Sequence, residues 1–567
     1  MLTPSRMSAA PSPAPSGPAW YRQPVLLLTL ATICCLAPFA NKAAHIDDYL
    51  FLRSAQQILS DPADPFGTTV NWYGFAMPLA DVTQNPPLAC YYLAAAGRLF
   101  GWSEPALHLA FLLPAIAAVL ATHALARRLC PQPILAAAIA LVSPVFWISA
   151  TTLMCDVPML ALWLWALELW LCGLDRNQHR WLALAAGMVA LAALTKYFAL
   201  SLIPLLFVYT TVRERRPSWK LLWFALPVLA LAAFDRWTAH RYGHGMLAGA
   251  GLYARMQQVS GPLWQRGLIT LSFTGGCLLP LLFVAHRLWS RRGLALGLGF
   301  AATLVAVLPL AAQLTTLELH GAAGTRWDAI AQVALFAALG LAPLALVVGD
   351  LRAHRNADSL LLALWVLGTL VFTAGLNWSV NGRSLLPLAP VVAILVVRRL
   401  AARGPASPPR RTWLQLWPLL PAAALSVAIV RADTAFARDS RAAARVLHEQ
   451  LGGRPGTLWF QGHWGFQYYM EQAGAKPLDK RAFAMTPGDH LISPTGNTNV
   501  SAPPAPPFVP AGKVTIAASG WISTMQIDLG AGFYSDGFGP LPFYFGPGTP
   551  QVYEVSRFDP PAWQTPR

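Results

Sequence analysis

The sequence predicts a polytopic α-helical membrane protein with a smaller α/β region at its C-terminal end. The 567 residues are 55% hydrophobic and only 12% charged, with a mean hydropathy of +0.46, and soluble proteins hold roughly twice that charged fraction. Apolar runs recur from residue 24 to about residue 430, and most are long enough to cross a bilayer. After residue 430 the pattern changes to shorter helices and strands.

The apolar runs predict about thirteen transmembrane helices. We interpret the first run as an uncleaved helix and not a signal peptide, because residues 38–42 make a poor cleavage site and many spans follow. Residues 1–23 are rich in Pro, Ser and Ala and predict a disordered cytoplasmic tail. The runs are 24–40, 106–126, 132–150, 157–173, 181–195, 198–212, 219–235, 264–286, 294–313, 327–349, 359–376, 384–399 and 413–430.

Basic clusters predict which loops face the cytoplasm. Six of them follow even-numbered spans, at 127–128, 175–180, 213–216, 286–292, 350–355 and 398–411. Because Lys and Arg favour the cytoplasmic side, the N-terminus is predicted inside and the region after residue 430 outside. This placement accounts for the net charge of +16 better than a nucleic-acid surface does.

The same topology brings the polar outliers to the outer face. They are Asp47 and Asp48 after the first span, Asp156 at the start of the fourth, Lys196 between the fifth and sixth, and Arg383 before the twelfth. Residues 41–105 form a long outer loop in which two helices are predicted on the membrane interface, one over "DDYLFLRSAQQIL" and one over "NPPLACYYLAAAGRLFG", whose start is set by Pro86-Pro87.

Residues 431–567 predict a small α/β domain outside the membrane. "DSRAAARVLHEQLGG" and "WGFQYYMEQAG" are typical of helices, "GTLWFQG" and "KVTIAAS" of strands, and "SAPPAPPFVP" of a loop. The aromatic content argues against a disordered tail. No Cys follows residue 277, so a disulfide framework is excluded here.

Five motifs in order carry a family resemblance. They are "DDY" after the first span, "NPPLACYYL" late in the first loop, "MCDVPML" at 154–160, "LAALTKY" at 191–197 and "GRSLLPLAP" at 382–390. Together they resemble the GT-C membrane glycosyltransferases of the bacterial family-39 type, similar to protein O-mannosyltransferases and the lipid A aminoarabinose transferase. The resemblance covers most of the chain. It implies a GT-C transmembrane domain over 24–430, a periplasmic domain over 431–567 and a place in the bacterial inner membrane.

The resemblance implies an activity. Such enzymes move a sugar from a polyprenyl-phosphate carrier to an acceptor, which is a lipid, glycan or protein hydroxyl, at the periplasmic face. The hydroxyl must lose a proton to a base, and the leaving phosphate must be held by cations. Asp47 matches the position of the proposed base and Asp48 that of a supporting acid, and Asp156 is the third catalytic candidate. Lys196 and Arg383 are implied to bind the phosphate.

Each of these residues also has a purely structural interpretation. Asp47 and Asp48 suit a solvated helix N-terminus, and Asp156 suits an N-cap before a proline. Lys196 suits a side chain that reaches from the bilayer to water. The family usually shows Arg-Tyr where this chain has Arg383-Ser384, which leaves the ring contact of that arginine open.

Further substrate-binding candidates are Asn85, His240, Arg241 and His244. The aminoarabinose transferases carry Lys before Pro-Pro where this chain has Gln84-Asn85, which argues against the same donor. His240, Arg241 and His244 lie in a segment that predicts a Gly-rich, substrate-facing loop, and their spacing only weakly suggests a metal site. We predict no cofactor and no metal. The aromatic side chains of "QGHWGFQYY" suit sugar stacking or packing onto the membrane domain.

Two other classes of function stay open. A transporter or flippase of lipid-linked sugars needs ionisable groups near the bilayer midplane and often shows repeats, whereas these polar residues lie at one boundary and no repeat is visible. A binding scaffold gives no reason for acids and bases to converge. The sequence therefore favours the glycosyltransferase.

Overall fold

The structure is a computed structural model that describes residues 22–256, 261–321, 324–403, 417–503, 507–518 and 520–560. The predicted disordered tail lies outside the described residues up to residue 21. The same holds for residues 404–416, which include part of the last basic cluster and the start of the last predicted span.

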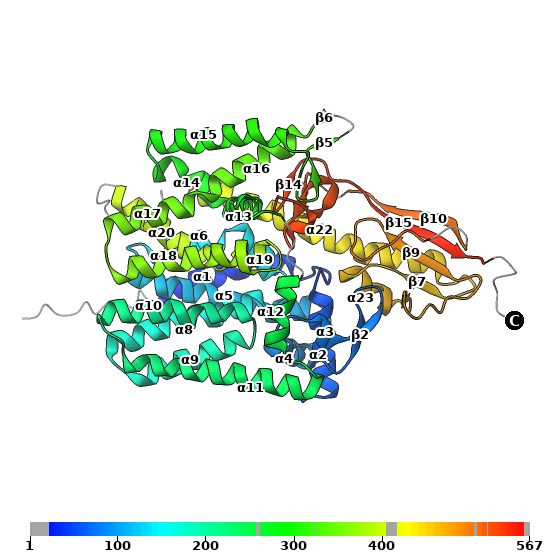
Figure 1. Ribbon diagram of the computed structural model, residues 1–567, viewed down its shortest axis with the longest axis horizontal. Helices are drawn as coiled ribbons and strands as arrows, with labels where there is room; N and C mark the ends of the chain where they lie inside the picture. Colours follow the sequence, from blue (N-terminus) through cyan, green and yellow to red (C-terminus); the bar gives the residue numbers. More distant parts are fainter. Residues whose placement is uncertain are drawn as a thin grey trace, which may run out of the picture.

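The transmembrane part is a bundle of apolar helices, at the left of Figure 1. Pro stands at the first or second position of five of them, where its missing N–H costs no hydrogen bond. The helices are α1 (Arg22–Leu36), α5 (Glu104–Leu129), α6 (Pro133–Leu141), α7 (Pro144–Ala150), α8 (Asp156–Arg176), α9 (His179–Ala193), α10 (Leu202–Glu214), α11 (Ala225–Tyr242), α13 (Leu263–Cys277), α14 (Pro280–Leu288), α15 (Arg291–Val307), α16 (Trp327–Gly340), α17 (Ala342–Ala353), α18 (Ala357–Val371), α20 (Leu388–Arg403) and α22 (Leu419–Leu451).

The helical membrane fold is confirmed, but the count of about thirteen spans is not. Within the described ranges, seven helices are long and apolar enough to cross a bilayer, and nine spans result if each bent pair counts as one. The bent pairs are α6–α7, with an angle of 63°, and α13–α14, with an angle of 92°. The predicted runs 24–40 and 181–195 form the shorter helices α1 and α9, of 15 residues each, which reach only about 22 Å.

Two bundle helices cross in close contact because glycines meet there. A Cβ atom on Gly275 of α13 would lie 1.9 Å from the Phe336 carbonyl oxygen, and one on Gly340 of α16 would lie 2.0 Å from that of Leu271. Backbones approach this closely in membrane proteins where small residues line the crossing. The pair supports the outer end of α13, which carries Arg266.

The basic clusters meet at one end of the bundle. Arg128 binds Glu168 and Asp175, and Arg213 also binds Asp175. Arg398 binds Asp350 at 2.8 Å and Ser359 at 3.0 Å. Side chains from loops far apart in the sequence are thus gathered on one side, as the charge pattern requires.

The first outer loop folds against the opposite end of the bundle. Both helices predicted in it are present. Residues Asp48–Leu52 are all buried, so the first turn of its first helix is enclosed by protein. The loop contains α2 (Asp48–Ser60), β1 (Thr69–Asn71), β2 (Ala76–Pro78), α3 (Leu79–Val82) and α4 (Leu88–Phe100); the short helices α12 (Met246–Met256) and α19 (Gly382–Leu385) lie at the same end.

Short β-hairpins and bridges complete the outer end. Antiparallel pairing joins β3 to β4, β5 to β6, β11 to β14 and β12 to β13. Their bounds are β3 (Gln313–Leu314), β4 (Leu317–Glu318), β5 (His320–Gly321), β6 (Gly324–Thr325), β11 (Ile522–Ser523), β12 (Met525–Gln526), β13 (Ala531–Gly532) and β14 (Tyr544–Phe545).

The C-terminal region carries a mixed five-stranded sheet in the order β10-β15-β9-β7-β8. Strands β10, β15 and β9 pair antiparallel, while β7 pairs parallel with β9 and β8. The predicted helix and strand segments are present, although β10 begins inside the predicted Pro-rich loop, of which residues 504–506 lie outside the described part. The elements are β7 (Leu458–Phe460), α23 (Trp464–Gln472), β8 (Lys476–Pro477), β9 (His490–Pro494), β10 (Phe508–Ile516) and β15 (Gln551–Phe558).

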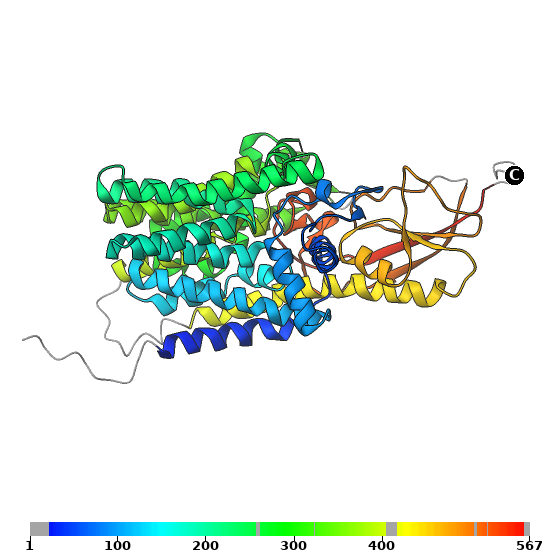
Figure 2. The same ribbon diagram turned by 90° about the horizontal axis from the view of Figure 1, so that it is seen from below.

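One helix joins the two parts without a break. Figure 2 shows α22 (yellow) leaving the bundle and continuing along the sheet. It runs from Leu419 to Leu451, across the predicted domain boundary at residue 431, which itself remains a prediction. The segment 522–545 then folds back onto the bundle, where Phe543 packs edge-on against Phe336 at 5.5 Å between ring centroids.

Candidate active site

A sharp turn between α1 and α2 places the two adjacent acids. Ile46 has φ of +46°, a left-handed conformation that is uncommon for a β-branched residue. Asp47 and Asp48 follow it and use their side chains differently. Asp47 is the N-cap residue of α2, but its carboxylate makes no capping hydrogen bond there.

Asp47 pairs with Arg383. Its Oδ2 accepts a hydrogen bond from Arg383 Nη2 at 2.9 Å, and the side chains are 29% and 13% exposed. Arg383 lies in α19, where Asn381 caps the turn by accepting a hydrogen bond from the Ser384 N–H at 2.9 Å. The two motifs that contribute this pair are 336 residues apart in the chain.

Asp156 pairs with Lys196 and also faces Arg383. Lys196 Nζ donates to Asp156 Oδ1 at 2.5 Å, and Arg383 Nη1 lies 3.8 Å from Asp156 Oδ2. Asp156 is the first residue of α8, after the N-cap Cys155, and is 1% exposed. The structural interpretations therefore do not hold: Asp156 is not the N-cap, and Lys196 is held by a carboxylate.

The four side chains form one row of alternating charge: Asp47, Arg383, Asp156, Lys196. Two buried atoms in this row, Arg383 Nε and Asp156 Oδ2, have no hydrogen-bond partner among the described residues. A guanidinium with a spare donor beside an ammonium can bind an anion such as a phosphate. Of the two acids in the row, Asp47 is more exposed than Asp156, and its carboxylate can accept a proton.

Asp48 holds the backbone. Its Oδ2 accepts from the His45 N–H at 2.9 Å and its Oδ1 from the Leu153 N–H at 2.8 Å. It ties the turn before α2 to the segment that leads into α8. Burial raises the pKa of Asp48 from 3.8 to about 7, against the lowering effect of Lys42 and of these two hydrogen bonds. Asp48 thus fixes the backbone on which Asp47 stands.

Asn85 lies beside the row, in the loop that meets the end of α9. The Leu88 N–H donates to the Leu194 carbonyl at 3.1 Å, which brings the "NPPL" turn next to Lys196 through the backbone. Asn85 is half-buried. This backbone contact is the link between the turn that holds Asn85 and the segment that holds Lys196, so the role of Asn85 stays a prediction.

The remaining predicted residues lie around the end of α11, where Arg241 and His244 make a second set of contacts and His240 is exposed. His240 and Arg241 lie in the last turn of α11 and not in a loop, because the helix continues to Tyr242 before Gly243 ends it with φ of +82°. Arg241 binds Asp64 at 2.7 Å and His244 binds Asp81 at 2.8 Å. Both contacts fasten the first outer loop. A metal cluster of three or more His, Cys, Asp or Glu is not found within the described ranges.

The "QGHWGFQYY" segment packs onto the outer loop. The Ala44 N–H donates to the Tyr469 hydroxyl at 2.7 Å, and that hydroxyl donates to Glu104 at 2.9 Å. A Cβ atom on Gly465 would lie 2.0 Å from the Ala44 carbonyl oxygen. Of the two interpretations of these aromatic residues, the structure supports packing.

A buried ion pair next to the site was not anticipated from the sequence. Lys42 Nζ lies 2.6 Å from Asp433 Oδ2, and both side chains are fully buried. Asp433 also accepts hydrogen bonds from Thr524 at 2.8 Å and Tyr534 at 2.9 Å. The sequence did offer two signals for this pair, because Lys42 stands just before "HIDDY" and Asp433 stands inside an apolar helix. For Tyr534 the sequence offered no such signal.

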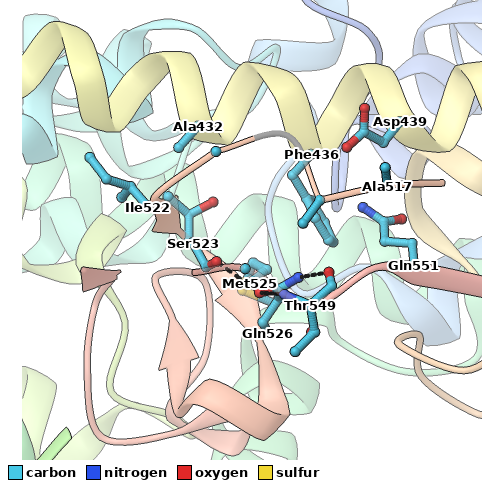
Figure 3. Close-up of a pocket in the computed structure, with 14 residues that line it drawn as sticks. Ala432, Phe436, Asp439, Ala517, Ile522, Ser523, Met525, Gln526, Thr549 and Gln551 are labelled. Atoms are coloured by element: carbon cyan, nitrogen blue, oxygen red, sulfur yellow. Dashed lines mark hydrogen bonds between the residues drawn. The ribbon is translucent and has the colours of Figure 1, made fainter. Parts of the chain in front are cut away.

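A pocket beside α22 is separate from the charged row. Figure 3 shows Phe436 and Asp439 of α22 facing the segments around Gln526 and Gln551. The Gln526 amide is already used, because it accepts from Ser523 at 2.7 Å and donates to the Thr549 carbonyl at 2.7 Å. No member of the charged row lines this pocket.

Comparison with known proteins gives a family match and fold matches. Residues 84–240 match the family described as dolichyl-phosphate-mannose-protein mannosyltransferase. An Archaeoglobus fulgidus oligosaccharyltransferase, solved with a tethered acceptor peptide, is similar with a TM-score of 0.50 and 13% identity, over 81% of this chain and 64% of its own. No curated protein matches the chain.

Two other solved structures are similar at lower scores. ArnT from Cupriavidus metallidurans bound to undecaprenyl phosphate has a TM-score of 0.43 and 14% identity, over 83% of this chain and 92% of its own. The arabinofuranosyltransferase AftD from Mycobacteria has a TM-score of 0.48 and 13% identity, over 95% and 40%. The chain is thus a multi-pass membrane protein that shares the fold of the Archaeoglobus fulgidus oligosaccharyltransferase, and its residues 84–240 match the mannosyltransferase family, in agreement with the resemblance that the motifs predicted.

Proposed function

We propose that the chain transfers a sugar from a polyprenyl-phosphate carrier to an acceptor hydroxyl. The observation that carries the proposal is the row Asp47, Arg383, Asp156, Lys196, in which one arginine faces two carboxylates and keeps an unused donor. The matched family is named after a lipid-phosphate-linked sugar donor. The acceptor class is a lipid, a glycan or a protein hydroxyl.

The donor phosphate is proposed to bind to Arg383 and Lys196. Both cations are partly exposed, at 13% and 20%, and both are balanced by acids before any anion arrives. The unused donor of Arg383 is Nε, whereas Nη2 is bound to Asp47. A phosphate that also attracts Nη2 competes with Asp47 for the guanidinium. Binding of the donor would thus release the carboxylate that the reaction needs.

In the transfer step the acceptor oxygen attacks the anomeric carbon. The bond from that carbon to the phosphate oxygen breaks, and the polyprenyl phosphate leaves with the electron pair. The proton of the hydroxyl passes to Asp47. Arg383 and Lys196 offset the charge that develops on the leaving phosphate. Asp156 keeps both cations in place.

The reaction is proposed to take place at the periplasmic face of a bacterial inner membrane. The charged row lies at the end of the bundle opposite the basic clusters, beside the C-terminal region. By the bias of Lys and Arg toward the cytoplasm, that end faces outward.

The experiment uses the purified full-length chain in proteoliposomes with a panel of radiolabelled polyprenyl-phosphate sugars and a bacterial envelope extract as acceptor source. We expect the wild type to consume at least one donor and Arg383→Gln to lose at least about 10-fold in rate, because a charge-assisted contact is removed. Arg326→Gln is the matched control, since Arg326 also pairs with an acid at the outer end, Asp328. Movement of a donor across the bilayer without sugar transfer would contradict the proposal and favour a flippase.

A further inference from the structure

Tyr534 lies between the charged row and the buried ion pair. It is 2% exposed. The Arg383 guanidinium carbon lies 5.5 Å from the centroid of its ring, and its hydroxyl donates to Asp433 Oδ2 at 2.9 Å. The ring is therefore in contact with the arginine, while the hydroxyl points to the opposite side.

The hydroxyl is held by an acid that cannot move freely. Asp433 also binds Lys42 at 2.6 Å and Thr524 at 2.8 Å, and all of these side chains are buried. The ring of His45 packs edge-on against Tyr534 with 5.1 Å between centroids. The tyrosine ring is thus fixed in direction by contacts on three sides.

The backbone around Tyr534 pairs with the backbone around Arg383. The Gly382 N–H donates to the Phe533 carbonyl at 2.7 Å. Asp536 donates its N–H to the Val380 carbonyl at 2.9 Å and accepts from the Val380 N–H at 3.0 Å. A Cβ atom on Gly382 would lie 2.2 Å from the Phe533 ring, so the two segments fit closely.

We propose that Tyr534 is a positioning residue that sets the plane of the Arg383 guanidinium and so determines how tightly the donor phosphate binds. The inference rests on the proposed function. A ring beneath a guanidinium attracts it through the ring quadrupole. In this chain the ring comes from the C-terminal region, 151 positions further on. The C-terminal region is thereby part of the donor site.

The test measures the dissociation constant of undecaprenyl phosphate for full-length protein in nanodiscs, together with the midpoint of thermal unfolding. Tyr534→Met removes the ring and fills its space, and we expect about 10-fold weaker binding. Tyr534→Phe keeps the ring and is expected within 2-fold of the wild type. Tyr553→Met is the matched control: Tyr553 is equally buried, at 3% exposed, but packs on Phe466 at 5.0 Å.

A double-mutant cycle with Arg383→Gln separates positioning from general destabilisation. In the Arg383→Gln background, Tyr534→Met should weaken binding no further. Equal losses in both backgrounds, or wild-type affinity in Tyr534→Met, would overturn the inference and leave the proposed function standing. If Tyr534→Met does not fold, Tyr534→Phe is the deciding variant, because it keeps the ring and removes the hydroxyl. A 10-fold weaker binding of undecaprenyl phosphate at an unchanged unfolding midpoint would then overturn the role of the ring. A wild type that does not bind undecaprenyl phosphate overturns the proposed function and this inference with it.

Discussion

Asp47 and Asp48 are neighbours in the chain and have different surroundings. Asp47 is partly exposed and meets a cation, while Asp48 is buried and meets two backbone N–H groups. The turn at Ile46, with φ of +46°, sends the two carboxylates in different directions. Of these two acids, Asp47 is therefore the one that we propose takes the proton from the acceptor.

Replacing Asp48 should change the pH dependence of stability more than the chemistry. The pKa of Asp48 is raised to about 7, so between about pH 4 and pH 7 the folded chain keeps a proton that the unfolded chain has lost. This acid therefore makes the fold less stable as pH rises through that window. We expect the midpoint temperature of thermal unfolding to fall further between pH 5 and pH 8 in the wild type than in Asp48→Asn.

The control for this prediction is Asp61→Asn, because Asp61 is an exposed acid of the same loop, with a side chain that is 48% exposed. It should follow the wild type. Equal pH dependence of wild type and Asp48→Asn would show that Asp48 stays ionised. Sugar transfer by Asp48→Asn should fall by much less than transfer by an Asp47 variant.

At the scale of elements, short segments between helices carry the site. The row is built from the start of α2, the start of α8, the end of α9 and the short helix α19. The bundle fixes these helix ends relative to one another, and the C-terminal segment 531–538 packs against α19. A change in one of these contacts should alter the site without opening the bundle.

Gly382→Ala tests this coupling. The added methyl group would lie 2.2 Å from the Phe533 ring, so α19 must shift and Arg383 with it. We expect polyprenyl-phosphate binding to weaken at least about 10-fold, because a guanidinium that moves loses its directed hydrogen bonds. Gly368→Ala is the control, since no atom lies within 4 Å of the Cβ position there. Unchanged binding in Gly382→Ala would contradict the coupling.

The sequence predicted the elements unevenly. Long apolar runs such as those of α5 and α8 are recognisable from composition alone, since burial in lipid requires it. The breaks at α6–α7 and α13–α14 were missed, although Pro144 and Pro280 stand at the starts of α7 and α14 and a proline ends or bends a helix at that point. His240 and Arg241 were placed in a loop because glycines follow, yet the helix reaches Tyr242.

At the scale of the whole molecule, the charge pattern predicts an orientation. The basic clusters lie at one end and the charged row with the C-terminal region at the other. A membrane-impermeant thiol reagent should label a cysteine at Ala482, which is exposed on the C-terminal region, in spheroplasts of a variant without native cysteines. A cysteine at Arg216 should be labelled only after lysis. The reverse result would contradict the predicted topology.

Part of the site was open to prediction and part was not. The sequence motifs contain the four residues of the row, Asp47, Asp156, Lys196 and Arg383. Each is a charged residue next to an apolar run, and a charge in that position is costly unless it is paired or has a function. The ion pair of Lys42 with Asp433 joins residues 391 positions apart, and Tyr534 resembles any other buried aromatic residue in the sequence. Only the fold brings these together.

The most direct test of the account is sugar transfer by Asp47→Asn, measured with the donor that the wild type uses and at equal protein levels. We expect the rate to fall at least about 100-fold, because the general base is lost, while undecaprenyl phosphate binds at least as tightly as in the wild type, because Asp47 no longer competes for Arg383. Asp64→Asn, which removes an acid that pairs with Arg241 in the same loop, should transfer at the wild-type rate. Transfer by Asp47→Asn at the wild-type rate would contradict the assignment of Asp47 as the base.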